Sequence, residues 1–183
     1  MLSAPTSSKD CRVCGGPFLP FNTMQIVCGV ACARRVPVIN RKAEKAELKR
    51  RKEAAKPRSK WLQEAQSVVN RYARLRDAHL GCASCDRPAN WNGQWHGSHF
   101  RSVGAASAVR FNLWNIHKAC SICNNWKSGN LSDYEPRLRA RIGDAKVDWL
   151  RTQNQRADYP VEYLKRLKRV FTKKCNRLEA RNG

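Results

Sequence analysis

Two pairs of cysteines in the second half of the chain bracket residues that could hydrolyse a phosphodiester. Each pair has the CxxC spacing of a zinc knuckle, and two such pairs can complete one tetrahedral site of four thiolates: Cys82, Cys85, Cys120 and Cys123. Imidazole, amide and amine side chains lie between and just after the pairs: His99, Asn115, His117, Asn124 and Lys127. Such groups can supply a general base, an oxygen ligand for a second cation and a positive charge near phosphate.

The two sets of residues favour different metals. Soft thiolates prefer zinc, whereas carbonyl and amide oxygens prefer magnesium or manganese. We therefore expect a structural Zn²⁺ on the four cysteines and a separate Mg²⁺ or Mn²⁺ at the histidine and asparagine cluster. Phosphate and water would complete the coordination of that second ion.

The N-terminal segment, residues 1–33, carries a second set of cysteines with CxxC and CxxxC spacing: Cys11, Cys14, Cys28 and Cys32. A segment this short cannot bury much of a core, so we interpret it as a second structural zinc knuckle, stabilised by its metal. Reduced thiols without metal are the alternative for both sets. The ninth cysteine, Cys175, is interpreted as a small buried residue of a C-terminal helix.

The composition indicates a polyanionic partner. The 183 residues include 36 Lys and Arg against 14 Asp and Glu, a formal net charge of +22. The excess extends from Arg34 to Arg181, and nucleic acid is the simplest partner for it, with a solvated basic surface as the alternative. The sequence has no apolar run of about 20 residues and no signal-type apolar segment at its start, so we expect no membrane span and a cytoplasmic protein.

The pattern along the chain predicts an α+β fold whose zinc-held core has flanking helices. Residues 34–58 form a basic helical linker or arm, and Pro57 favours a boundary at residues 56–59. Residues 59–135 form the core, with an amphipathic helix near residues 61–75 and a short hairpin within residues 91–100. Residues 136–183 are basic C-terminal helices. We expect the last helices over residues 132–142, 144–151 and 160–174, the first of them ending at Gly143.

The order CxxC, SH, NIHxxCxxCNxxKSGN resembles the HNH (ββα-metal) nucleases that carry a zinc knuckle, including junction resolvases of the endonuclease VII type. It is more similar to the lambdoid phage NinG (Rap) recombination proteins, in the KPRSxW segment at residues 56–61 and the RFNxxNIHKxC segment at residues 110–120. That resemblance covers nearly the whole chain. It implies a treble-clef-like HNH core and a structure-specific endonuclease that cleaves Holliday junctions and D-loops in the cytoplasm of the bacterial host.

The resemblance also implies a role for each matching residue. His99 matches the general base, and Asn115 matches the asparagine that braces the loop by hydrogen bonds. Asn124 matches a metal ligand that acts through its amide oxygen. Lys127, three residues further on, could contact the scissile or an adjacent phosphate.

One position departs from the HNH pattern. Many of these nucleases place Asp directly before the first histidine, but here that residue is Ser98, which carries no charge. Either Asn124 holds the cation with help from His96 or His117, or the ion is bound weakly. We favour His117 because it belongs to the NIH segment, and Arg101 and Arg110 are candidate phosphate contacts.

We expect a homodimer, because symmetric nicking of a four-way junction needs two active sites. A non-catalytic, zinc-dependent DNA-binding recombination factor is the main alternative, and the missing Asp is its best support. An RNA-binding zinc protein is a further alternative.

Overall fold

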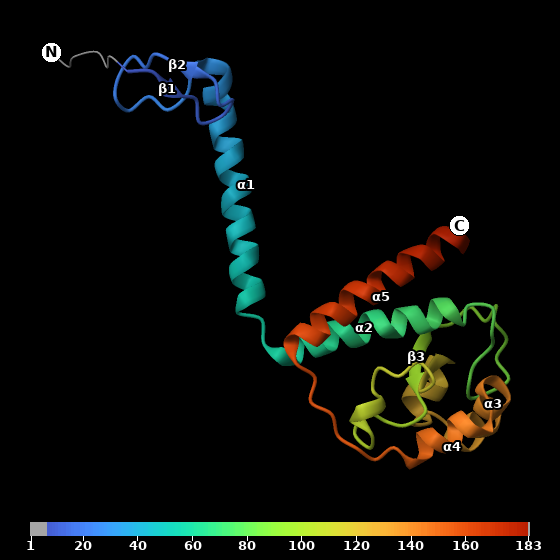
Figure 1. Cartoon of the computed structure of the whole chain (residues 1–183). Helices are drawn as coiled ribbons and strands as arrows, with labels where there is room; N and C mark the ends of the chain where they lie inside the picture. The colour runs from blue at the N-terminus through green and yellow to red at the C-terminus, as the bar shows by residue number, and fades with distance from the viewer. Residues whose placement is uncertain (1–6, 183) are drawn as a thin grey trace. The chain divides into compact units, whose positions relative to one another are not determined.

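The structure, a computed structural model, describes residues 7–182 and divides the chain into two compact units (Figure 1). The first unit ends at Lys56 and the second begins at Pro57. This division lies within residues 56–59, where the sequence predicts a boundary. None of the described helices is long and apolar enough to cross a membrane.

The first unit consists of a cysteine-rich loop region and one helix. Strands β1 (Lys9–Asp10) and β2 (Pro17–Phe18) pair antiparallel, and helix α1 spans Val30–Ala54. The basic segment is therefore a continuous helix, and it begins before residue 34, so that Cys32 lies in its first turn. No residue of α1 is buried, as its lack of an apolar stripe predicts.

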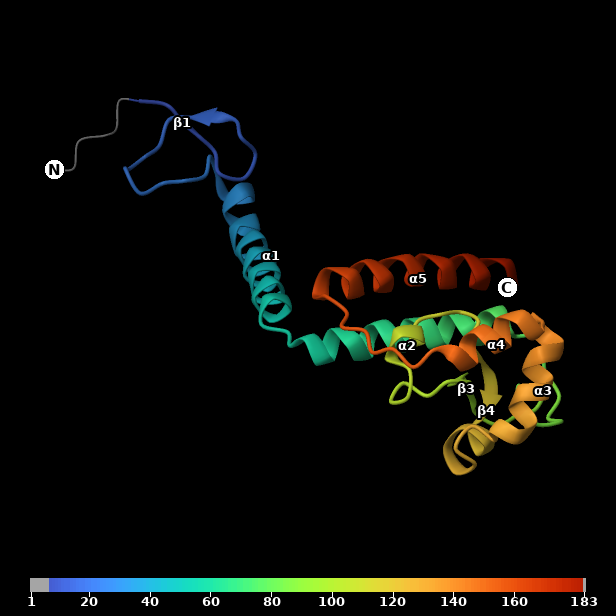
Figure 2. The ribbon, with the colours of Figure 1, turned by 60° about the horizontal axis from the view of Figure 1, so that its bottom comes forward.

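The second unit is built around helix α2 (Arg58–Arg76), with a two-stranded sheet on one face and helix α5 (Val161–Asn182) on another (Figures 1 and 2). Pro57 precedes α2 in an extended conformation, which suits a residue at a helix N-terminus. Side chains from α2, the sheet, α5 and the loop that precedes Ile116 form one core: Trp61, Ala65, Val69, Ala73, Phe111, Ile116, Leu164 and Phe171. The C-terminal helix is thus an integral layer of this unit.

The sheet pairs β3 (Trp95–His99) with β4 (Ile116–Cys120) in antiparallel register, Ser98 opposite His117 and His99 opposite Ile116. The predicted hairpin within residues 91–100 is wrong, because that segment supplies only one strand and its partner lies some 20 residues further along the chain. Gly97 instead permits close packing on α2: a Cβ added there would lie 2.8 Å from Asn70 Cβ.

Short helices follow the sheet. They are the 3₁₀ turn η1 (Ser107–Val109) between the strands, the π-helical turn η2 (Ile122–Trp126), α3 (Leu131–Ile142) and α4 (Asp144–Thr152). The predicted helices over residues 132–142 and 144–151 are present, and α5 is longer than predicted. Helix α3 is preceded by Asn130, in a left-handed conformation, and ends before Gly143. The fold is mixed α+β with two small antiparallel sheets.

Candidate functional site

The four cysteines of the second unit converge at one end of the sheet. Their sulfur atoms all lie within 4.8 Å of one another, and Cys85 Sγ is 3.8 Å from Cys120 Sγ. Backbone amides point at two of the sulfurs, with Cys120 N–H donating to Cys82 Sγ (3.2 Å) and Cys123 N–H donating to Cys120 Sγ (3.4 Å). These donors stabilise thiolates. The arrangement could hold a metal ion, and four thiolate donors suit zinc.

A cation in the same cluster favours the thiolate form of Cys85. The Arg87 guanidinium donates to Cys85 Sγ (3.3 Å) and Cys120 Sγ (3.5 Å). Burial acts to raise the pKa of Cys85, but hydrogen bonds from the Arg87 backbone and side chain outweigh it and lower the pKa to about 7. A metal can therefore displace the Cys85 proton at little cost near neutral pH.

The N-terminal cysteines form a second convergent group, again with sulfur atoms all within 4.8 Å of one another: Cys11, Cys14, Cys28 and Cys32. Cys28 Sγ lies 3.8 Å from Cys14 Sγ and 3.6 Å from Cys32 Sγ, and Cys28 N–H donates to Cys11 Sγ. Helix α1 supplies Cys32, and the two short loops supply the others. This group too could hold a metal ion.

His99 lies at the end of β3, half-buried under α2, with one ring nitrogen committed. Its Nε2 is 3.0 Å from the carbonyl oxygen of Arg110, so Nε2 carries the proton and donates. Nδ1 then keeps its lone pair and has no protein partner among residues 7–182. Burial lowers the pKa of His99 below its ordinary value, opposed by the Arg110 carbonyl. The ring is therefore a neutral imidazole near pH 7, able to accept a proton.

Asn124 and His96 lie side by side. Asn124 Nδ2 contacts His96 Nδ1 (3.1 Å) and donates to Asn125 Oδ1 (3.0 Å). Because these contacts use both amide hydrogens, the Oδ1 atom of Asn124 remains available as a ligand. In the neutral tautomer that accepts this hydrogen bond, His96 carries its proton on Nε2, where it can donate to an anion.

The His96–Asn124 pair lines a polar hollow of about 300 Å³, together with Asn70, Arg74, Gln94, Trp95 and Gly97. A second hollow of about 390 Å³ shares Arg74 and Trp95 with it and adds Arg71 and Lys118. Neither lining contains a carboxylate. The Arg74 guanidinium is common to both hollows and lies beside the amides of the first, a combination that suits a phosphate backbone.

Two side chains of α2, Gln66 and Asn70, lie between this polar hollow and His99. Gln66 Nε2 donates to Asn70 Oδ1 (2.7 Å), and the same amide nitrogen lies 3.4 Å from His99 Nε2. Gln66 Oε1 accepts a hydrogen bond from Arg110 Nε (2.8 Å). Gln66 and Asn70 are four residues apart, so they share the helix face that covers the sheet. Sequence reasoning missed them, although two amides four residues apart on an amphipathic helix were a usable signal.

Asn115 is fully buried in the segment that joins the two strands. Its Oδ1 accepts from Arg101 N–H (2.7 Å), and its Nδ2 donates to the carbonyls of Arg101 (3.0 Å) and Val109 (3.1 Å). All of these partners are backbone groups. The amide thus holds the two ends of the β3–β4 connection together and has no oxygen free for a metal.

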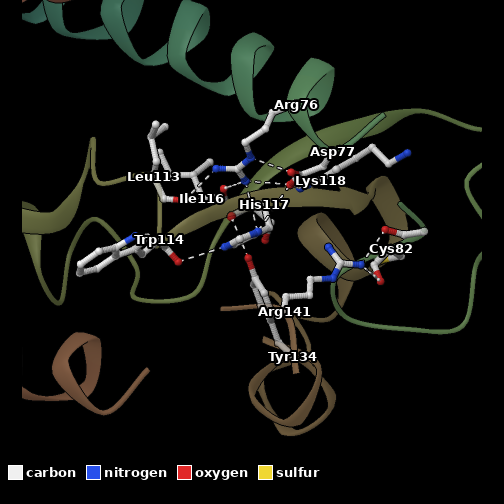
Figure 3. Close-up of polar contacts among 12 residues, drawn as sticks. Arg76, Asp77, Cys82, Leu113, Trp114, Ile116, His117, Lys118, Tyr134 and Arg141 are labelled. Carbon is white, nitrogen blue, oxygen red and sulfur yellow. Dashed lines mark hydrogen bonds and ion pairs between the residues drawn. The ribbon is translucent and has the colours of Figure 1, made fainter. Parts of the chain in front are cut away.

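His117 lies in a buried polar cluster at the C-terminal end of α2 (Figure 3). Its Nε2 donates to the Trp114 carbonyl (3.0 Å), while Nδ1 lies 3.2 Å from Arg76 Nη2 and 3.5 Å from Asp77 Oδ2. With both ring nitrogens occupied, His117 has no free ligand atom. The structure therefore places His96, and not His117, beside Asn124.

Arg76 and Asp77 are the centre of that cluster, and the sequence analysis did not single them out. Asp77 accepts from Arg76 Nε (2.6 Å) and Nη2 (2.8 Å) and from Lys118 N–H (3.1 Å). Arg76 also donates to the carbonyls of Leu113 and Ile116. Burial acts to raise the pKa of Asp77, but the bond from Arg76 and the neighbouring His117 hold that pKa well below its usual range. The pair ties α2 to β4.

The remaining candidates differ in exposure. Lys127 follows η2 and is exposed, as is the adjacent Trp126, 84% of whose surface is accessible. Arg101 donates to Gln153 and Asn154, whereas Arg110 bonds to Gln66, so both guanidinium groups already have protein partners. Ser98 is buried opposite His117.

Comparison with known proteins places the chain in one family. The family model described as Bacteriophage Lambda NinG protein matches residues 3–181. The ninG protein of Escherichia phage lambda is 37% identical over 198 residues, which cover 97% of this chain and 96% of the relative. That of Salmonella phage P22 is 37% identical over 196 residues, and that of Escherichia phage 933W is 34% identical over 194, each covering 96% of both chains. No solved structure matches. The chain therefore belongs to the NinG family of lambdoid phages.

Proposed function

We propose that this protein is a metal-dependent, HNH-type endonuclease that cleaves branched DNA, such as Holliday junctions and D-loops, during phage recombination. The observation that carries the proposal is the contact between Asn124, in η2, and His96, on β3, in a polar hollow next to a cysteine tetrad. Strand β3 also carries His99. In this proposal β3, β4 and η2 form the ββα-metal core, and the two tetrads bind structural zinc.

The proposed roles follow from the free atoms of each side chain. The Nδ1 lone pair of His99 takes the proton from the attacking water, because Nε2 is held by the Arg110 carbonyl. Asn124 Oδ1 would hold a Mg²⁺ or Mn²⁺ ion, which would neutralise charge on the phosphate. His96 donates from Nε2 to a phosphate oxygen, taking the supporting role that the sequence analysis gave to His117. Lys127 binds an adjacent phosphate.

The surroundings of the hollow favour DNA as the substrate. Arg74 lines both adjoining hollows, so a phosphate backbone that contacts it can lie across both. The other two cations of the second hollow have protein partners: Arg71 pairs with Glu179, and the buried Lys118 donates to the Ala78 carbonyl. The net charge of +22 adds long-range attraction to any nucleic acid. We further propose a homodimer acting in the cytoplasm of the bacterial host, because two active sites cut a four-way junction symmetrically.

A non-catalytic DNA-binding recombination factor is the second candidate. The observation that favours it is the absence of a carboxylate from the lining of the His96–Asn124 hollow. Ser98, which takes the place of the usual Asp in the sequence, is buried and does not belong to that lining. One neutral oxygen binds a divalent cation more weakly than a carboxylate does.

Incubation with a labelled four-way junction and a linear duplex of matched sequence separates the two candidates. The endonuclease proposal predicts nicking of the junction with Mg²⁺ or Mn²⁺ and none with EDTA. Asn124→Ala should raise the cation concentration needed for half-maximal cleavage, while Asn92→Ala, at an exposed asparagine in the loop before β3, should leave it unchanged. Tight junction binding without cleavage at any cation concentration would establish the second candidate.

A further inference from the structure

Helix α2 separates two outer surfaces of the second unit. Gln66 and Asn70 face the sheet, through their contacts with His99 and Gly97. Glu64 and Tyr72 lie two residues before and after that pair, and a step of two residues turns a helix by about 200°. They face α5, where Lys168 Nζ lies 2.8 Å from Glu64 Oε2.

Further contacts fix α5 on this opposite face. The rings of Tyr72 and Phe171 pack edge to face at 5.1 Å, and Cys175 Sγ lies 3.8 Å from the Val68 carbonyl. Both ribbon views show α5 running along α2 (Figures 1 and 2). The outer face of α5 is therefore on the other side of α2 from the sheet and the His96–Asn124 hollow.

That outer face carries a stripe of exposed cations, which we call the α5 stripe: Arg166, Arg169, Lys173 and Arg177. Each is two residues from a residue that α5 buries, namely Leu164, Phe171 or Cys175, so the stripe points away from α2. No ion pair joins any of the four to a carboxylate within residues 7–182. The stripe is thus an unneutralised row of positive charge.

The length of the α5 stripe matches a nucleic-acid backbone. Arg166 and Arg177 are 11 residues apart, which is about 16 Å along a helix that rises 1.5 Å per residue. One strand of a duplex carries a phosphate about every 3.4 Å of its axis, so the stripe spans about five phosphates. Glu162 lies one turn before Arg166 and pairs with Lys165, so the stripe carries a single sign of charge from Arg166 to Arg177.

A hollow of about 440 Å³ opens beside the α5 stripe, lined by Trp61, Lys165, Lys168, Arg169, Thr172 and Lys173. The Lys165 and Lys168 ammonium groups lie 5.4 Å and 5.6 Å from the centre of the Trp61 ring. The aromatic face thus holds two lysines next to the stripe and gives the row of charge a concave flank.

We propose that the α5 stripe binds the phosphate backbone of a second arm of a branched DNA, while the first arm occupies the surface around the His96–Asn124 hollow. The inference rests on the proposed function. An enzyme specific for branched DNA must distinguish a branch from a linear duplex, and the α5 stripe would allow one chain to do so. A straight duplex cannot reach both sides of α2 at once, whereas two arms of a junction diverge and can.

Binding without cleavage tests this surface separately from catalysis. In the His99→Ala background and in EDTA, the dissociation constant is measured for a four-way junction and for a linear duplex over a series of salt concentrations. The test variant replaces all four residues of the α5 stripe with Gln. The control replaces four exposed basic residues of α1 with Gln and so removes the same net charge: Arg41, Lys45, Lys49 and Lys52.

The stripe variant should weaken junction binding by at least tenfold. It should also reduce the slope of log affinity against log salt concentration by up to about 3.6, since each lost phosphate contact contributes about 0.9. Its affinity for linear duplex should change by less than threefold. The α1 variant should leave the ratio of junction to duplex affinity unchanged. A variant in which the three stripe arginines become lysine should bind the junction like the parent, because phosphate attraction needs only the charge.

Equal loss for junction and duplex in the stripe variant would overturn the proposal, as would no loss at all. Preference of the parent for double-stranded RNA over junction DNA would also overturn it. The ratio of affinities is measured without cleavage. Failure of the nuclease proposal would therefore appear as an uncut junction, and failure of the stripe proposal as an unchanged ratio.

Discussion

The buried cluster around Asp77 allows a sharp test of what holds the second unit together. Only 4% of Asp77 is exposed, and Asp77→Asn keeps the shape of the side chain while removing its charge. The substitution leaves the Arg76 guanidinium without its carboxylate and removes one of the acceptors facing Lys118 N–H and His117. These groups join α2 to β4, so the loss should lower the stability of the whole unit.

We expect Asp77→Asn to lower the free energy of unfolding by about 3 kcal/mol. Removing one partner of a buried ion pair costs about 3–5 kcal/mol, and the lower end applies because 26% of the Arg76 side chain is exposed. For a unit of about this size, the melting temperature falls by roughly 4 °C for each kcal/mol of unfolding free energy that is lost. The expected fall is therefore roughly 12 °C. The matched control is Asp86→Asn, whose carboxylate is paired with Arg137 but 95% exposed, and it should change stability by less than about 0.5 kcal/mol.

The pH dependence adds a second readout. The pKa of Asp77 is lower in the folded than in the unfolded protein, so its contribution is complete above the unfolded value of about 3.9 and is lost as the pH falls through the folded value. The difference between parent and Asp77→Asn in urea unfolding should thus be constant from pH 6 to 8 and shrink below about pH 4. Equal stability of the Asp77 and Asp86 variants would refute the assignment of His117 and its neighbours as a structural cluster.

Three further predictions concern packing, metal and pH. Gly97→Ala should cost about 1–3 kcal/mol in urea unfolding, because its Cβ would lie 2.8 Å from Asn70 Cβ; a neutral result would contradict the close packing of β3 on α2. Elemental analysis should find two zinc ions per chain in the parent and in Cys175→Ala but one in Cys123→Ser, and a chain without zinc would contradict both tetrads. The cleavage rate should rise with pH along an acid limb below pH 6.5, since burial lowers the pKa of His99; a limb above pH 7 would exclude His99 as the base.

Local patterns predicted much of the fold. Cysteine spacing identified both tetrads, because two close pairs can surround one ion wherever the intervening chain goes. Apolar periodicity predicted α2, and Gly143 predicted the end of α3, since both signals act over a few residues. The presence of Cys32 inside α1 was missed, because a helix can begin within a metal-binding motif without any change in composition.

Non-local pairing limited the rest. The pattern of residues 91–100 is compatible with a local hairpin, and nothing in it indicates that residues 95–99 pair with residues 116–120. That register decides which histidine lies beside Asn124: it places His117 in the Arg76–Asp77 cluster and leaves His96 next to Asn124. Successive strand residues point to opposite faces, so motif order alone cannot distinguish these positions.

The most direct test of the proposed endonuclease compares single-turnover cleavage of a four-way junction by His99→Ala and by His79→Ala, a control at an exposed histidine. Both variants should retain two zinc ions and the junction affinity of the parent. If His99 is the general base, His99→Ala lowers the rate with Mg²⁺ or Mn²⁺ by at least about 100-fold, the usual contribution of such a base, while His79→Ala cleaves like the parent. Parental cleavage by a folded His99→Ala variant would exclude His99 as the general base.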